Sequence, residues 1–137
     1  MEECELCFEA IDSKCQFSCQ HQMCLMCFIE YSKSQHICHI CRQEIEYNKI
    51  NYGGDQGFYF SGFDGTIRTL NSINLEKMMC TQLYRIVELR LFGRYFDDLR
   101  LIFSGRQLAR NDVKLCDFKP NFGHYSTLDC VLKLKAD

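Results

Sequence analysis

Residues 4–41 read CELCFEAIDSKCQFSCQHQMCLMCFIEYSKSQHICHIC and hold eight of the eleven cysteines of the 137-residue chain. Two cysteines separated by two residues can chelate one tetrahedral ion from a tight turn, and zinc prefers thiolate and imidazole ligands. The expected ligands are Cys4, Cys7, Cys19, His21, Cys24, Cys27, Cys38 and Cys41. Eight ligands complete two closed sites, so we predict two structural zinc ions that leave no open position for water.

The high cysteine count has two explanations. A secreted disulfide scaffold favours an even number of cysteines and an export signal. This chain has eleven cysteines and begins with the acidic stretch Met1-Glu2-Glu3. We therefore expect zinc binding in a reducing compartment, the cytosol or the nucleus. Zinc would replace the hydrophobic core that a segment of about 40 residues lacks, contributing on the order of 10–16 kcal/mol per site.

The remaining sequence divides at a stretch rich in glycine and polar residues. We predict a first domain over residues 1–47, a linker over 48–57 and a second domain over 58–137. As a flexible coil, ten such residues span about 16–19 Å. No apolar run approaches the roughly 18 residues of a membrane span. Neither half of the chain carries the basic patch that nucleic acid demands, so we expect neither a membrane nor a nucleic-acid partner.

The ligand string resembles the RING finger family. Its single histidine is fourth among the eight ligands, as in RING fingers, whereas PHD fingers place it fifth. The resemblance implies a small α+β cross-brace domain, although spacing alone leaves the pairing open. One ion would be held by Cys4, Cys7, Cys24 and Cys27, and the other by Cys19, His21, Cys38 and Cys41. Cys15, His36 and His39 are spare candidates that we do not expect to be ligands.

RING domains mostly act as ubiquitin ligases that dock a ubiquitin-charged conjugating enzyme. By this resemblance Leu6, Tyr31 and Ile40 match contacts to the conjugating enzyme, and a short helix over residues 28–33 presents Tyr31. His39 stands among these contacts where many active RING domains have proline, which weakens the expected docking.

Arg42 follows the last ligand at once, as the activating arginine of many RING ligases does. A guanidinium there can hydrogen-bond ubiquitin and the conjugating enzyme together, which lysine cannot copy. The alternative is a solvated surface arginine.

The second domain shows both helical and strand periodicity. A helix within residues 75–92 would bury Leu83, Ile86, Val87 and Leu91, which recur at i, i+3, i+4 and i+8. Before it, apolar stretches flank a turn at Asp64-Gly65. After it we expect a strand at 99–103, a turn at Ser104-Gly105 and a strand from Ser126 to Leu134. Cys80, Cys116 and Cys130 fall in apolar segments and are expected to be small buried hydrophobes.

This order of elements, together with the stretches 100–108, 115–118 and 126–134, resembles ubiquitin. The resemblance implies an α+β ubiquitin-like β-grasp roll. Ile102 and Val131 would match the aliphatic patch by which ubiquitin is recognised, with Arg100 and Lys133 as its basic rim. Alternatively, the linker or the first domain half covers both side chains.

Two further positions limit what the second domain can do. The chain ends in Ala136-Asp137 where ubiquitin has two glycines, so we do not expect this domain to be conjugated. Arg106 stands at the position of a chain-forming lysine, which excludes chain extension there.

Two functions are consistent with these features. The first is an enzyme, a RING-type ubiquitin-protein ligase whose partners are a ubiquitin-conjugating enzyme and ubiquitin. The alternative is a non-catalytic zinc-binding adaptor whose ubiquitin-like domain recruits ubiquitin receptors or the proteasome. Whether the second domain inhibits, activates or only docks stays open. A monomer is favoured, because Cys4 leaves little chain for a flanking dimerisation helix.

Overall fold

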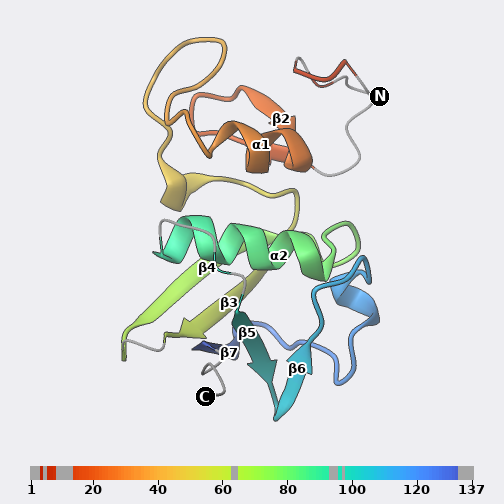
Figure 1. Ribbon diagram of the computed structural model, residues 1–137. Coiled ribbons are helices and arrows are strands. Elements are labelled where there is room, and N and C mark those ends of the chain that lie inside the picture. The colour runs from red at the N-terminus through yellow and green to blue at the C-terminus, as the bar shows by residue number, and fades with distance from the viewer. Residues whose placement is uncertain are drawn as a thin grey trace.

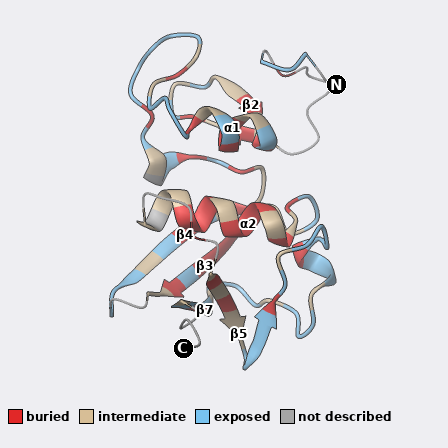
Figure 2. Ribbon diagram, viewed as in Figure 1, coloured by how far each residue is buried: buried red, intermediate tan, exposed pale blue. Residues whose placement is uncertain are grey.

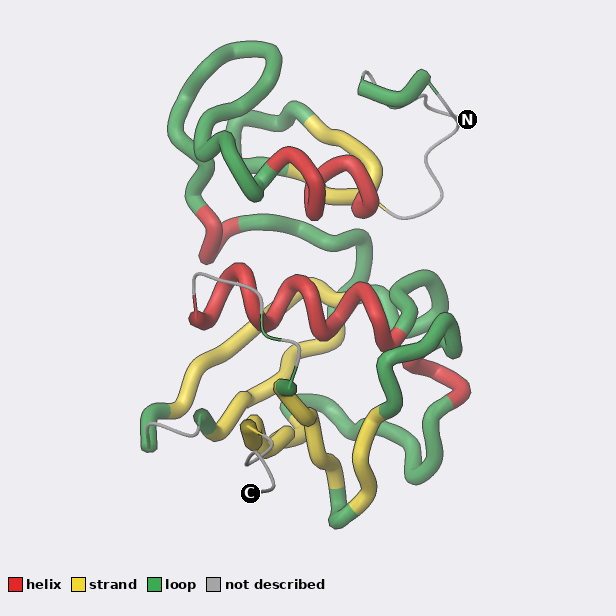
Figure 3. Tube along the Cα trace, viewed as in Figure 1, coloured by secondary structure: helices red, strands yellow, loops and turns green. Residues whose placement is uncertain are grey.

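The computed structural model describes residues 4, 6–8, 14–62, 65–92, 96 and 98–132. It has two units that lie one above the other in Figure 1, both of mixed α and β structure. Helix α2 (Cys80–Val87) lies between the sheet of the carboxy-terminal unit and the amino-terminal unit (Figures 1 and 3). Among the described residues, no helix is long and apolar enough to cross a lipid bilayer.

The amino-terminal unit is a short hairpin followed by a helix. Its elements are β1 (Lys14–Gln16), β2 (Gln22–Cys24) and α1 (Leu25–Tyr31), with β1 and β2 antiparallel. Leu25, Phe28 and Ile29 share one face of α1 and are buried. We expected this helix over 28–33, but it begins at Leu25 because that side chain extends the buried face by one turn.

The carboxy-terminal unit has a sheet of five strands. They are β3 (Gln56–Ser61), β4 (Ile67–Ile73), β5 (Leu99–Phe103), β6 (Arg106–Leu108) and β7 (Ser126–Leu132). Their order is β4-β3-β7-β5-β6, in which β3 and β7 are parallel and the other neighbours are antiparallel. Two hairpins joined through α2 thus lie on either side of β7 in one sheet below the helix. This is a β-grasp-like sheet, as expected.

Helix α2 is shorter than expected but buries the expected face. Leu83, Ile86 and Val87 have no exposed surface, whereas the side chain of Leu91 is not among those described. After Val87 the chain continues as a π-helical turn over Glu88–Phe92. Residues 75–79 precede the regular helix, and the side-chain oxygen of Asn74 accepts the N–H of Glu76 at 3.0 Å in a turn.

The expected strands and turns are mostly confirmed. The strand at 99–103 is β5, and Ser104 and Gly105 form the next turn with φ of 52° and 76°. Gly65 has a φ of 83° beside β4, while Asp64 lies outside the described residues. β7 is described as far as Leu132, so the expected end of that strand is not described either. The described part of the chain also contains two short 3-10 helices, η1 (Tyr47–Lys49) and η3 (Leu115–Asp117).

Inward-facing strand residues and the buried face of α2 form the core of the carboxy-terminal unit (Figure 2). Cys80 and Cys130 belong to it, as expected of small buried hydrophobes. The same prediction was wrong for Cys116, which is exposed. In η3 the buried side chain is that of Leu115, and the next residue along so tight a helix points away from the core.

The segment between the two units is not the flexible coil that its glycines suggested. Ile50 and Tyr52 are buried, and β3 already begins at Gln56. The backbone of Asn51 pairs with Gln16 of β1. The division into domains at residues 47 and 58 remains a prediction. The segment between them is hydrogen-bonded to β1 through Asn51 and to β4 through Tyr52.

Candidate metal centre and the surfaces around it

The eight expected ligands gather into two groups. One holds Cys4, Cys7, Cys24 and Cys27, and the other holds Cys19, His21, Cys38 and Cys41. Within each group the candidate ligand atoms lie within 4.8 Å of one another. The groups interleave along the chain, because residues of the second group lie between the two pairs of the first. This is the division of ligands that we expected.

The separations within the groups fit a tetrahedral zinc ion. Zn–S bonds of about 2.3 Å and Zn–N bonds of about 2.0–2.1 Å place two sulfurs about 3.8 Å apart and a sulfur and a nitrogen about 3.5 Å apart. The Sγ atoms of Cys7 and Cys24 lie 3.8 Å apart. Nδ1 of His21 lies 3.5 Å from the Sγ atoms of both Cys19 and Cys38. Each group can therefore hold one zinc ion, through Nδ1 in the case of the histidine.

Two of the cysteine pairs form the same turn. The N–H of Phe8 donates to the carbonyl of Cys4 at 2.8 Å, and the N–H of Arg42 donates to the carbonyl of Cys38 at 3.0 Å. Phe8 and Arg42 also share a left-handed backbone, with φ of 62° and 61°. Because the turns match, the residue before the second cysteine occupies the same position in each.

Backbone N–H groups lower the pKa of one ligand thiol in each group. Burial raises the pKa of Cys4, but the N–H groups of Cys24, Cys7 and Leu6 outweigh it and lower this pKa to about 6. The N–H of Gln43 lowers the pKa of Cys41 to about 7. By contrast, burial raises the pKa values of Cys24 and Cys27 above that of an ordinary thiol. A bound zinc ion displaces such protons, because a coordinating thiol is deprotonated.

The three spare candidates lie elsewhere. Cys15 is fully buried between the two units, and burial raises its pKa well above the ordinary value. His36 contacts the hydroxyl of Tyr47 through Nδ1 at 2.7 Å. The His39 ring packs edge-on against the rings of Phe17 and Tyr31. Neither metal group includes any of the three, as expected.

Several residues expected to contact a conjugating enzyme lie at the surface around these groups. Leu6 and Ile40, which occupy the same position in the two matching turns, are 39% and 41% exposed. Arg42 follows Ile40 by two residues and is also exposed. Tyr31 is half-buried, and its hydroxyl donates to the carbonyl of Ile37 at 2.6 Å.

Sequence reasoning missed two apolar residues on the same unit. Phe8 is 75% exposed. It occupies the same position in the turn of Cys4 and Cys7 that Arg42 occupies in the turn of Cys38 and Cys41. Met26, between two ligands, is also largely exposed. Position beside a ligand does not identify them, because Leu25 and Phe28 each directly follow a ligand and are buried.

The three described residues of the expected ubiquitin-like patch lie on the face of the sheet that α2 does not cover. Arg100 and Val131 are partners across β5 and β7, and Ile102 follows on β5. Val131 is 40% exposed, while Arg100 and Ile102 are half-buried. Lys133 lies outside the described residues. Sequence reasoning missed Tyr59 and Tyr125, two partly exposed residues whose ring centroids lie 5.1 Å apart.

Comparison with known proteins yields no family model and no curated protein that matches this chain. Among solved structures, the chain is similar to a computationally designed protein based on the template of human erythrocytic ubiquitin, determined in solution by NMR. The two are 22% identical with a TM-score of 0.49, and the likeness covers 60% of this chain and 96% of the other.

Proposed function

We propose that this protein is a RING-type ubiquitin-protein ligase. One observation carries the proposal: two interleaved groups of zinc ligands present Leu6 and Ile40 from two matching turns, with both side chains exposed. Closed zinc sites have no open coordination position, so the metal supplies a rigid frame and takes no part in the chemistry. The same interleaving supports assignment of the amino-terminal unit to the RING cross-brace.

In this proposal the protein acts by positioning. Leu6, Ile40 and Tyr31 hold the conjugating enzyme, and His39 supports Tyr31 through its ring contact. The exposed guanidinium of Arg42 hydrogen-bonds ubiquitin and the conjugating enzyme together, which keeps the thioester ready for attack by a lysine. The ligase contributes no nucleophile of its own.

The placement of the β-grasp-like unit bears on its role. Helix α2 packs below α1, and Leu6 and Ile40 stay exposed. Inhibition by covering these two residues is therefore disfavoured.

A second function is favoured by the other exposed surface. Val131 is about as exposed as Ile40, and β7, which carries it, lies on the far side of α2 from the amino-terminal unit (Figure 1). This surface suits an adaptor in which the β-grasp-like unit binds ubiquitin receptors or the proteasome and the zinc module is only structural.

Ubiquitin discharge from a panel of charged conjugating enzymes tests the proposal. We expect the full chain to accelerate discharge to free lysine with at least one of them. Arg42→Ala should lose most of this acceleration, and Arg106→Ala, an exposed arginine of the other unit, should retain it. Cys24→Ser serves as a control for loss of the zinc frame. If no conjugating enzyme of the panel discharges faster, the ligase proposal is refuted and the adaptor proposal remains.

A further inference from the structure

The segment that joins the two units is hydrogen-bonded to both at adjacent residues. Asn51 exchanges two backbone hydrogen bonds with Gln16 of β1, each 2.9 Å long. The next residue, Tyr52, donates its N–H to the carbonyl of Ser72 in β4 at 3.0 Å, and Gly54 donates to the same carbonyl at 3.2 Å. No residue between the two attachments is left to act as a hinge.

Arg90 reaches from the carboxy-terminal unit to this segment. Arg90 lies in the π-helical turn after α2, and its guanidinium donates to the hydroxyl of Tyr52 at 2.8 Å. The guanidinium also lies 5.4 Å from the ring centroid of Tyr47, within the range of a cation–π contact. Tyr52 is almost fully buried, so Arg90 supplies a partner to a hydroxyl that water does not reach.

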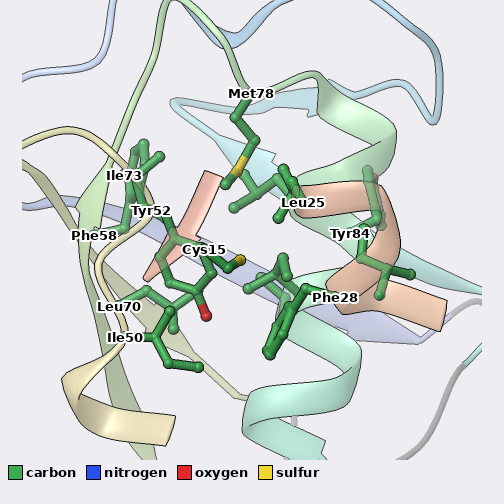
Figure 4. Packing of buried hydrophobic residues seen from close by; sticks show 14 of the residues in the cluster. Cys15, Leu25, Phe28, Ile50, Tyr52, Phe58, Leu70, Ile73, Met78 and Tyr84 are labelled. Atoms are coloured by element: carbon green, nitrogen blue, oxygen red, sulfur yellow. The ribbon is translucent and has the colours of Figure 1, made fainter. Parts of the chain in front are cut away.

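The two helices complete the contact. Leu25 and Phe28 of α1 are fully buried in a unit too small to bury them by itself. Figure 4 shows them in one cluster with Ile50, Tyr52 and residues of the β-grasp-like unit. At the edge of this contact, the side-chain amide of Gln82 on α2 donates to the sulfur of Met26 on α1 at 3.2 Å.

We infer that the zinc module and the β-grasp-like unit form one cooperative folding unit, and that Arg90 couples them across Tyr52. The folded zinc module supplies the apolar cover of α2. When the module loses zinc, that cover is lost together with the contact between Phe28 and the ring of Tyr52, the partner of Arg90, so α2 opens more readily. Zinc occupancy thereby controls the order of a helix that contains no zinc ligand. This coupling goes beyond the proposed ligase, and its test requires no ubiquitin transfer.

Hydrogen exchange of the full-length protein tests the coupling. Amide exchange in peptides that cover α2 and β5 is measured with zinc bound and after a strong chelator removes zinc under reducing conditions. We expect exchange in α2 to accelerate on the order of tenfold or more on chelation, because local opening becomes easier. Unchanged exchange in α2 and β5 after complete zinc removal would overturn the inference.

A matched pair of variants tests the role of Arg90. In Arg90→Met the acceleration on chelation should be several-fold smaller than in the parent, because α2 is already less protected with zinc bound. Arg106→Met removes an arginine that lies over the ring of Phe118 inside the β-grasp-like unit, and it should keep the acceleration of the parent. Equal acceleration in the two variants would overturn the assignment of the coupling to Arg90.

Discussion

Glu88 is completely buried, and its Oε1 lies 3.0 Å from a terminal guanidinium nitrogen of Arg110. The other terminal nitrogen of Arg110 donates to the carbonyl of Phe96 at 2.6 Å, and the N–H of Phe96 donates back to Glu88. The guanidinium also lies 4.2 Å from the ring centroid of Tyr84. This closed arrangement ties the end of α2 to the chain that enters β5.

We predict a large loss of stability when only one member of this pair is removed. Arg110→Met leaves the buried carboxylate with only the more distant guanidinium of Arg85, at 3.8 Å, and loss of its closer cation should cost up to roughly 3–5 kcal/mol. In the double variant with Glu88→Gln the buried charge is gone, so its loss should be smaller than the sum of the two single losses. Urea unfolding of the zinc-loaded proteins measures all three.

An exposed ion pair provides the control. Lys49 lies 2.9 Å from Glu46, and both side chains are largely exposed. Lys49→Met should therefore cost less than about 1 kcal/mol. Comparable losses for Lys49→Met and Arg110→Met would show that burial of Glu88 does not determine the effect.

The parts of this protein predicted from sequence are those fixed by local spacing. Cysteine pairs close tight turns wherever they occur, so the ligands were found by counting. Alternation along β7 likewise predicted that strand, whereas the exposure of Val131 was expected from the resemblance to ubiquitin. The ubiquitin-ligase function rests on a resemblance and remains a proposal.

The contact between the units was not predictable in the same way. It depends on how two folded surfaces pack against each other, and the spacing of residues along the chain does not predict such packing. Ile50 and Tyr52 stand alone among polar residues and glycines, so neither periodicity includes them. The glycines in this segment suggested flexibility. Gly54 is instead required by close packing, because a Cβ at this position would clash with the carbonyl oxygen of Ile73.

The close approach at Gly54 gives a second prediction. Gly54→Ala forces the backbone of β4 away from the joining segment and should cost about 1–3 kcal/mol, as overpacking does. Gly123→Ala is the matched control, because the nearest atom to its added Cβ is the hydroxyl of Ser126 at 3.8 Å. Its effect should stay within about 0.5 kcal/mol. Thermal unfolding compares the two, and equal shifts would contradict a packed joining segment.

Two cysteines of the amino-terminal unit should behave differently toward zinc. Cys24 belongs to a ligand group, so Cys24→Ala should leave the protein with fewer than two zinc ions per chain. Cys15 is a core residue outside both groups, so Cys15→Ala should keep both ions and lose about 1–2 kcal/mol of stability. Elemental analysis after desalting gives the stoichiometry. Loss of zinc from Cys15→Ala in protein that remains folded would make Cys15 a ligand.

Ile40 and Val131 separate the two proposed functions, because their exposed fractions are 41% and 40% but they belong to different units. In a ligase, Ile40 packs at the centre of the contact with the conjugating enzyme, where the few residues lie whose truncation costs more than about 1 kcal/mol. Ile40→Ala should therefore slow single-turnover discharge several-fold at subsaturating ligase, and Val131→Ala should not. Both variants should retain zinc, since neither residue is a ligand. In an adaptor only Val131→Ala weakens binding to a purified ubiquitin receptor, and discharge is absent in every variant.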